Sequence, residues 1–273
     1  MISKFNILLV TLGVFCFSSA QNESYSILYK VKSKSYEGQK YDDITYLSVF
    51  KKRDSIISQW YGQRKLDSIA SVRIPLDTER STYYSRERYI VQIVNDTITF
   101  NETVANTKWI YSESIKYEWK LGGKSKVING YECKNAFTTY GGRNWEAWYS
   151  KDVPLDVGLY KFKGLPGMII SINDKEHLFT FELYDMGKRN NLKFTVYEPT
   201  YKEYDIKQTT RKEFNEFKRS YNSLSLNEQL NYLNKDKPGR VSFKMTSSDE
   251  SIGRGFNAAS KTNTVNYIEI DGN

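Results

Sequence analysis

Residues 127–150 read VINGYECKNAFTTYGGRNWEAWYS, and this stretch decides the fold. Two dipeptides, Asn129-Gly130 and Gly141-Gly142, separate three runs that are rich in aromatic and β-branched residues. Both dipeptides tolerate the positive φ angles that tight two-residue hairpin turns require. The stretch therefore predicts three consecutive antiparallel strands, the last of them covering residues 143–150.

The same pattern extends outward from this meander over residues 25–197. Residues 44–50 and 115–121 alternate between apolar and polar side chains, which predicts half-buried strands. Asn173-Asp174-Lys175 separates two further apolar runs and predicts another hairpin. No amphipathic helices intervene between these strands, so a parallel sheet is disfavoured. We predict a mainly β protein with a curved antiparallel sheet or half barrel of meander hairpins.

The chain changes character after Pro199. Thr210 followed by Glu213, and Ser225 followed by Glu228, both have the spacing of a capping box, and apolar residues at helical intervals follow each pair. The sequence predicts two short helices within 210–235 that pack on the sheet. The fold class is therefore α+β, with the helical segment near the end of the chain.

Residues 1–20 have the features of a secretory signal peptide. Lys4 supplies a positive charge, residues 7–17 form an apolar run too short to cross a bilayer, and Ser18-Ser19-Ala20 offers a cleavage site before Gln21. We expect export to the periplasm or an association with the outer membrane, and no transmembrane span in the mature chain. Residues 21–246 form one predicted domain, and residues 247–273 are expected to be a polar, mobile tail.

The composition disfavours most catalytic mechanisms, because the chain has few of the residues that they require. The 273-residue chain has a net charge of +8, two cysteines and one histidine. His177 lies in a turn-like run, and Cys133 lies in a strand-like run where a free cysteine packs as a small hydrophobe. No zinc-type cluster or nucleotide-binding loop is present in the sequence. We expect no catalytic residue, no metal and no cofactor, although a hydrolase with a carboxylate pair stays open because such a pair is spatial rather than sequential.

Nucleic acid is not an expected partner. A basic, aromatic chain can provide cationic grooves and stacking platforms. In this sequence the Lys and Arg residues are spread along the chain instead of forming one block, and the chain carries an export signal. Tyr and Trp also suit half-exposed β surfaces without any nucleic acid.

Residues 145–149 (WEAWY), residues 153–155 (VPL) and residues 158–169 (GLYKFKGLPGMI) together resemble the GLPGLI family. Residues 128–136 and Gly142-Arg143 add to the resemblance, which covers about 108–186. Two positions depart from the family pattern: Met168 replaces a Leu, and Leu159 stands where a Pro is expected. The resemblance implies an exported protein of Gram-negative bacteria, and the family brings no established molecular activity.

The motif itself, Gly164-Leu165-Pro166-Gly167-Met168-Ile169, has the residues of a type II turn. Pro166 fixes φ at the first central position and Gly167 accepts a positive φ at the second. Met168 and Ile169 then enter a buried strand. We favour this structural role over the alternative, a rigid loop that contacts a partner.

Alternation along residues 145–149 places Trp145 and Trp148 on opposite faces of the strand. We expect one Trp in the core and the other on an exposed surface, with Arg143 and Lys161 nearby as cationic groups. Such a surface predicts a non-enzymatic binding or accessory protein for an outer-membrane or periplasmic partner, or for an apolar or peptide ligand. The alternative hypothesis is a periplasmic hydrolase with a carboxylate pair.

Overall fold

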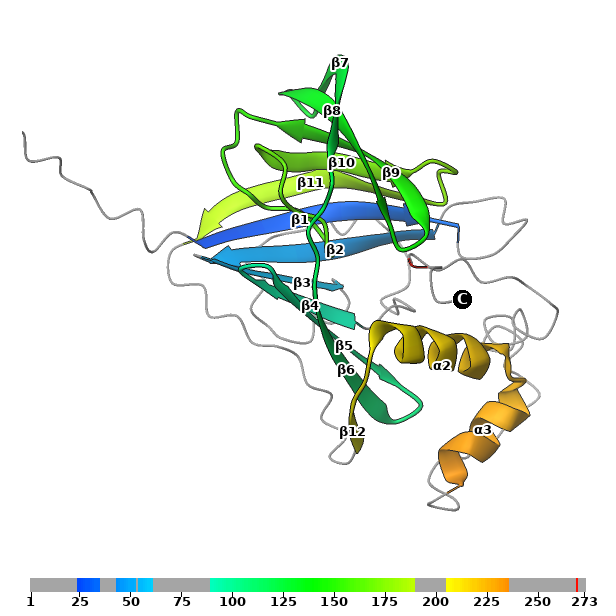
Figure 1. The fold of residues 1–273 in the computed structure, drawn as a ribbon. Helices are drawn as coiled ribbons and strands as arrows, with labels where there is room; N and C mark the ends of the chain where they lie inside the picture. Colours follow the sequence, from blue (N-terminus) through cyan, green and yellow to red (C-terminus); the bar gives the residue numbers. More distant parts are fainter. Residues whose placement is uncertain are drawn as a thin grey trace, which may run out of the picture.

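The computed structural model describes residues 24–34, 43–52, 54–60, 89–189, 205–235 and 269. These residues form an open, curved sheet of twelve strands in the order β12-β6-β5-β4-β3-β2-β1-β11-β10-β9-β8-β7 (Figure 1). The strands are β1 (Ser24–Ser33), β2 (Asp43–Lys52), β3 (Ser55–Trp60), β4 (Tyr89–Val94), β5 (Thr97–Val104), β6 (Thr107–Ser114), β7 (Lys120–Ile128), β8 (Tyr131–Tyr140), β9 (Arg143–Ser150), β10 (Met168–Asp174), β11 (Phe179–Arg189) and β12 (Asp205–Gln208). The prediction of a mainly β fold with a curved sheet is confirmed.

The predicted meander is formed by β7, β8 and β9, which pair antiparallel. Asn129 and Gly130 have φ values of 50° and 83°, and Gly141 and Gly142 have values of 63° and 75°. Both hairpins thus use the left-handed backbone that these dipeptides predicted. The third strand covers Arg143–Ser150, the residues expected from the sequence.

The predicted second hairpin joins β10 to β11 across residues 175–178. Asp174 closes it: its backbone carbonyl accepts a hydrogen bond from the His177 N–H at 3.0 Å, and its carboxylate accepts one from the Phe179 N–H at 2.8 Å. His177 takes a positive φ of 52° at this turn. The first strand, β1, then pairs with β11 on one side and β2 on the other, so it lies in the middle of the sheet.

The sheet is mixed, because β12 pairs parallel with β6 while the other pairs are antiparallel. Register shifts interrupt the ladders of β1 with β11, β9 with β10 and β7 with β8. Such bulges bend a strand and increase its twist, which contributes to the curvature of the sheet.

The prediction of a strand over residues 115–121 is wrong for residues 115–119, which pair with no neighbouring strand among the described residues. β6 ends at Ser114 and β7 begins at Lys120, so residues 115–119, called the crossing segment below, lie in no ladder. Since β6 and β7 lie near opposite ends of the sheet, this segment runs across its open side (Figure 1). Tyr117 and Trp119 anchor it by donating hydrogen bonds to the backbone carbonyls of Lys161 (3.1 Å) and Lys163 (2.9 Å). The alternation still holds, since these two side chains are half-buried and their neighbours are exposed.

The inner face of the curved sheet is filled by residues 151–167, called the plug loop below. Five of its apolar side chains are at most 4% exposed, while Val153 and Leu155 are partly buried: the five are Val157, Leu159, Tyr160, Phe162 and Leu165. The Phe162 ring lies 4.8 Å from that of Trp145 on β9, and the Tyr160 ring lies 5.1 Å from that of Tyr89 on β4. The loop therefore packs on strands that are far apart in the sheet, and it joins both halves into one core.

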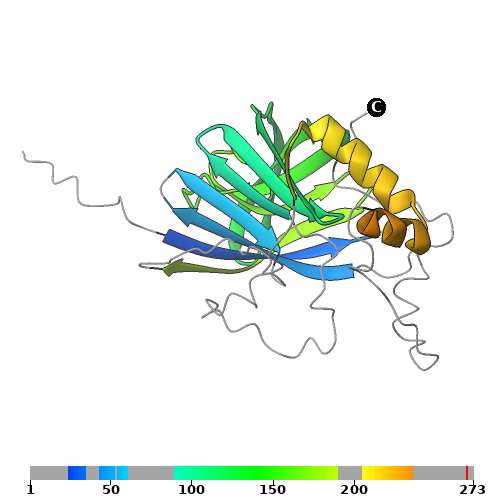
Figure 2. The same cartoon turned by 90° about the horizontal axis from the view of Figure 1, so that it is seen from below.

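Both predicted helices are present, α2 (Arg211–Ser223) and α3 (Leu226–Asn234), and both capping boxes are formed. α2 packs on one end of the sheet through Phe214, which is 2% exposed, and through Phe217, whose ring stacks on Trp109 at 4.2 Å. α3 packs on α2 through Tyr232, 5.5 Å from Tyr221 (Figure 2).

Two predictions fall outside the described residues: the signal peptide over residues 1–20, and the mobile tail over 247–273, from which the structure describes Glu269 alone. Both stay predictions, although Glu269 itself is buried at 7% exposure. In the described ranges, no helix combines the length and the apolar character that crossing a membrane requires.

Candidate functional site

The four residues predicted to form an exposed recognition surface are all buried. Trp145 is 1% exposed, Trp148 7%, Arg143 6% and Lys161 0%. The expectation that one Trp is exposed is therefore wrong. Trp145 lies on the inner face against the plug loop, while on the opposite face the ammonium of Lys126, from the edge strand β7, lies 3.9 Å from the centre of the Trp148 ring.

The structure also does not bring these four residues into one site. Arg143 donates a hydrogen bond to the carboxylate of Asp174 at 3.0 Å and lies over the ring of Phe179. Burial raises the pKa of Asp174, and the Phe179 N–H and Arg143 oppose that rise only in part. This pair ties the start of β9 to the end of β10.

Lys161 lies in a different place, at the centre of a group of charged and aromatic residues. Its ammonium contacts the Tyr111 hydroxyl (2.8 Å) and the carboxylates of Glu113 (2.8 Å) and Glu269 (2.7 Å). The rings of Phe100, Tyr111, Tyr140 and Tyr160 surround it at 4.9–5.6 Å. All three ammonium protons therefore have acceptors, so no donor of this buried side chain is left unsatisfied.

Glu269 completes this group, which we call the Lys161 cluster: Tyr111, Glu113, Tyr140, Tyr160, Lys161, Arg211 and Glu269. Arg211, the first residue of α2, lies 3.2 Å from Glu113 and 3.6 Å from Glu269. Tyr140 and Tyr160 donate to the Glu269 carboxylate, Tyr140 at 3.2 Å. Burial alone would raise the pKa of Glu269, but Lys161, the Tyr160 hydroxyl and Arg211 hold it below the ordinary value.

Sequence reasoning missed the Lys161 cluster. One local signal exists: Lys161 stands alone within an apolar run, Leu159 to Phe162, where a strand or buried loop has no room for an unpaired charge. The other members of the cluster, however, come from β6, β8, α2 and position 269, and no local pattern in the sequence connects them.

The motif Gly164 to Ile169 ends the plug loop and begins β10 at Met168. The type II turn predicted within it is wrong, because its expected hydrogen bond is not formed. The Gly167 N–H donates to the Leu165 carbonyl at 2.8 Å, which closes a three-residue turn around Pro166, and the Met168 N–H donates to Val153 instead. Gly167 does have the expected positive φ, at 146°. A Cβ at this position would lie 2.1 Å from the Ser150 carbonyl oxygen, so the backbone approach also requires glycine.

Cys133 is buried at 0% exposure, as expected for a structural cysteine. Burial raises the pKa of its thiol, which disfavours the nucleophilic thiolate. Among the described residues, no group of His, Cys, Asp and Glu side chains has the arrangement of a metal site.

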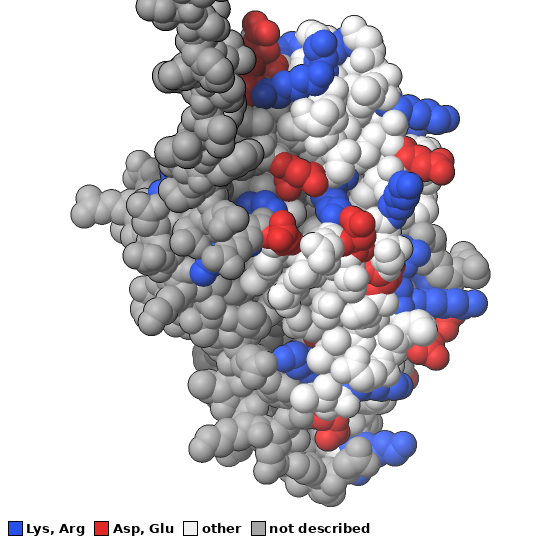
Figure 3. All heavy atoms as spheres, turned by 60° about the vertical axis from the view of Figure 1, so that its left-hand side comes forward, with Lys and Arg blue, Asp and Glu red and all other residues white. Residues whose placement is uncertain are grey.

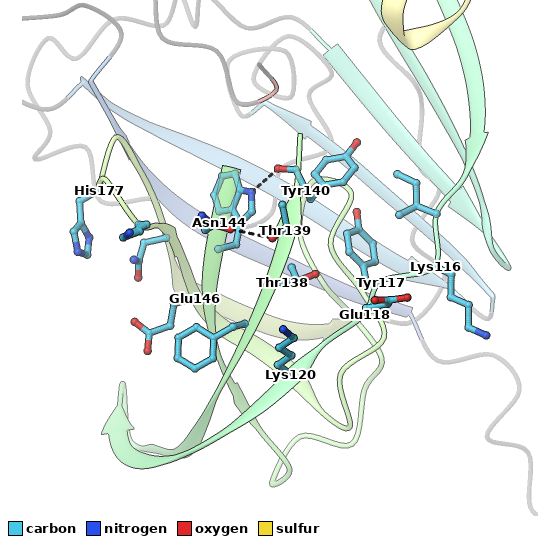
Figure 4. A pocket seen from close by; sticks show the side chains of 15 residues that line it. Lys116, Tyr117, Glu118, Lys120, Thr138, Thr139, Tyr140, Asn144, Glu146 and His177 are labelled. Atoms are coloured by element: carbon cyan, nitrogen blue, oxygen red, sulfur yellow. Dashed lines mark hydrogen bonds between the residues drawn. The ribbon is translucent and has the colours of Figure 1, made fainter. Parts of the chain in front are cut away.

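A groove of about 810 Å³ lies where the crossing segment, the β8–β9 hairpin and the β10–β11 turn meet (Figure 4). Lys116 and His177 lie at opposite ends of it in this view. The lining combines aromatic rings, hydroxyls, amides and both signs of charge: Ile115, Lys116, Tyr117, Glu118, Lys120, Phe137, Thr138, Thr139, Tyr140, Asn144, Trp145, Glu146, Asn173, Lys175 and His177. Such a groove can hold a ligand through apolar contact and hydrogen bonds together.

Several groups in the groove are accessible to a ligand. Phe137 is 41% exposed, although it belongs to a strand whose other aromatic residue near the groove, Tyr140, is buried. Cross-strand register aligns Phe137 with Glu146 and Glu146 with Asn173 on one face. Asn135 donates a hydrogen bond to Glu146 at 3.1 Å and thereby orients its carboxylate.

The edge strand β7 borders the groove but is poorly suited to pair with another strand. It has three lysines, Lys120, Lys124 and Lys126, and an irregular ladder to β8 around Gly122 and Gly123. Lysines and bulges are the devices by which edge strands avoid pairing. The neighbouring face of the molecule mixes basic and acidic side chains among uncharged ones, without a continuous patch of one sign (Figure 3).

Comparisons with known proteins leave the function open. No protein-family model matches the chain, and no curated protein matches it either. Among solved structures, two crystal forms of PNGF-II are similar, with TM-scores of 0.47 and 0.49 and 14% sequence identity. The matches cover 71% of this chain and 32% of the PNGF-II chain, so the chain spans about a third of the length of that protein.

Proposed function

We propose that this chain is an exported, non-enzymatic binding protein of the Gram-negative envelope and a member of the GLPGLI family. We further propose that the groove binds an extended peptide segment of an envelope partner. The observation that carries the proposal is the groove itself, with an exposed Phe137 among the mixed polar residues that line it. The plug loop packs against the inner face of the sheet and fills most of it, so we assign peptide binding to the groove beside it.

The chemistry of the lining favours a peptide over a purely apolar ligand. A peptide presents an amide N–H and a carbonyl at each residue, and Asn144, Asn173 and Thr139 offer matching donors and acceptors. Phe137 offers apolar contact for one side chain of the ligand. Lys116 and Glu118 provide both signs of charge on the crossing segment, so the groove has no strong preference for one net charge.

The test is direct binding between the mature chain and peptides selected from a random displayed library. Fluorescence anisotropy then compares the wild type with Phe137→Ala and with Ile206→Ala. Ile206 is 64% exposed on β12, at the opposite edge of the sheet, and is the matched control. We expect Phe137→Ala to weaken binding at least tenfold and Ile206→Ala to leave it unchanged. Equal affinities for all three proteins would contradict the groove assignment.

One observation favours the hydrolase alternative: Glu118 and Glu146 both line the groove. A carboxylate pair can supply a general acid and a base or nucleophile. A panel of chromogenic glycosides and esters tests it. Turnover that is lost in both Glu118→Gln and Glu146→Gln would replace the binding proposal with the hydrolase, whereas absence of turnover in the wild type supports binding.

Export is tested separately by the mass of the mature protein. If Ser18-Ser19-Ala20 is the cleavage site, the protein recovered from the envelope begins at Gln21. An Ala20→Leu variant should accumulate with residues 1–20 attached, because the cleavage site needs a small residue there. An envelope protein that retains these residues in the wild type would contradict the proposal.

A further inference from the structure

The carboxylate of Glu269 lies among the cationic and hydroxyl groups of the Lys161 cluster, in the position that a bound ligand would take. One oxygen of Glu269 receives the Lys161 ammonium at 2.7 Å and the hydroxyls of Tyr140 and Tyr160. The other oxygen accepts no hydrogen bond from the described residues and lies 3.6 Å from Arg211. One oxygen of Glu269 is therefore well paired with Lys161 and the two Tyr hydroxyls, whereas the other makes only a long contact with Arg211.

Three of the groups around Glu269, namely Lys161, Arg211 and Tyr140, also have contacts that do not involve Glu269. Lys161 also contacts Glu113 and Tyr111, Arg211 contacts Glu113, and the Tyr140 hydroxyl lies 3.3 Å from Glu113. These contacts come from β6, β8, the plug loop and α2. A cluster that is fixed by its own contacts is preorganised, so an incoming carboxylate has little reorganisation to drive.

Charge balance explains why the site would attract an anion. With Glu269 in place, Lys161 and Arg211 face two carboxylates, and the cluster is neutral. Without Glu269, the fully buried Lys161 ammonium keeps only Glu113 as a carboxylate partner among the described residues, and it shares Glu113 with Arg211. An uncompensated buried charge is costly, and a bound carboxylate removes that cost.

The β8–β9 turn also leaves space for the backbone of Glu269, because residue 141 of this turn is a glycine. A Cβ on Gly141 would lie 2.8 Å from Glu269 Cγ and 3.1 Å from its Cα. The glycine at this turn therefore has two roles, since its φ of 63° also suits the left-handed hairpin. The turn therefore leaves room for the backbone of Glu269 as well as for its side chain.

We propose that Lys161, Arg211, Tyr140 and Tyr160 form a binding site for the carboxylate of an acidic peptide segment, and that Glu269 is its ligand in cis. A carboxylate that approaches on another backbone, or as a small molecule, can occupy the same site when Glu269 is removed. This site is distinct from Phe137 and the polar groups on which the groove proposal depends, although Tyr140 lines both.

The first test is chemical rescue of Glu269→Ala in the full mature chain. We expect a lowered melting temperature that sodium propionate restores in part, by about 3 °C when propionate is present at about ten times its Kd. Sodium chloride at the same ionic strength and neutral propionamide should give no rescue. Glu228→Ala, which removes an exposed capping glutamate of α3, is the matched control and should not respond to propionate.

The second test uses a peptide in trans and does not require the Ala variant to fold. Glu269→Gln keeps the shape of the side chain, and a labelled peptide of residues 265–273 is titrated into it. We expect this peptide to bind at least tenfold more tightly than the same peptide with Gln at position 269, and an unrelated acidic peptide to bind between the two. If an unrelated acidic peptide equals the native one, the site recognises the carboxylate alone, which overturns the assignment to a peptide segment.

The proposal as a whole is overturned if propionate raises the melting temperature of Glu269→Ala no more than that of Glu228→Ala and the native and Gln peptides bind equally. Gly141→Ala gives an independent check, because it should weaken peptide binding by displacing the segment. Gly130→Ala is its control, since Gly130 has a φ of 83° in the equivalent turn and no heavy atom within 4 Å of the position that a Cβ would take. Failure of these tests leaves the Phe137 experiment unaffected, so the two proposals can fail separately.

Discussion

The ammonium of Lys161 lies 2.7 Å from the carboxylate of Glu269, and both side chains are buried, at 0% and 5% exposure. They are separated by more than a hundred residues of sequence, since Lys161 belongs to the plug loop. Glu113 on β6 and Arg211 on α2 meet at the same point. The Lys161 cluster therefore joins the plug loop, one end of the sheet and α2 through charges of which Lys161 and Glu269 are buried and Glu113 and Arg211 partly exposed.

The first prediction concerns Lys161→Met. The change leaves Glu113 and Glu269 without their shared ammonium, and we expect a loss of about 3–5 kcal/mol in the free energy of unfolding. Lys163→Met is the matched control from the same loop: its partner Asp96 is 83% exposed, so a loss of about 0–1 kcal/mol is expected. Urea denaturation measures both, and equal losses would contradict the importance of the buried pair.

The second prediction is a pH dependence caused by Glu269. Its pKa in the folded state is below the ordinary 4.5, so its stabilising contribution is fully present above pH 4.5 and is lost as the pH falls through the folded value. Tyr140 and Tyr160 stay protonated over this range, because burial and then the charge of Glu269 raise their pKa values.

Stability curves for the wild type and Glu269→Gln between pH 7 and pH 3 check this expectation. The wild type should be more stable at pH 7, and the difference should shrink below pH 4.5 because the Gln variant lacks this titrating group. A difference that stays constant over the whole range would show that the Glu269 charge does not stabilise the fold.

The third prediction concerns the motif turn. Gly167→Ala places a Cβ 2.1 Å from the Ser150 carbonyl oxygen at a φ of 146°, so we expect a loss of at least about 2 kcal/mol from strain and crowding. Gly130→Ala, which has positive φ but open space, should lose only about 1 kcal/mol. Thermal denaturation compares them, and a smaller loss at Gly167 would be inconsistent with the close approach to Ser150.

The fourth prediction concerns Arg143, whose burial was not expected. Arg143→Ala leaves the fully buried Asp174 carboxylate with only backbone donors, and we expect a loss of about 3–5 kcal/mol. The double variant Arg143→Met with Asp174→Asn should recover much of that loss, because it removes both charges. A double variant that is as unstable as the single one would indicate that Arg143 acts through packing on Phe179 rather than through the pair.

The local elements of this fold were predictable because their signals are local. Asn129-Gly130 and Gly141-Gly142 determine hairpins through φ angles that few other residues adopt, and Thr210 with Glu213 begins a helix through hydrogen bonds three residues apart. The positive φ of Gly167 was predictable for the same reason, although the turn around it has a different hydrogen bond.

Tertiary structure alone decided which side chains are buried and what surrounds them. Alternation places Trp145 and Trp148 on opposite faces, but it contains no information that the plug loop packs on Trp145 or that the Lys126 side chain lies over Trp148. The crossing segment has the alternation of a strand, yet its neighbours in space are loop carbonyls and not a strand. The partners of Lys161 come from four separate parts of the chain. A single sequence records the periodicity of each segment, whereas burial depends on which segments the folded chain brings together.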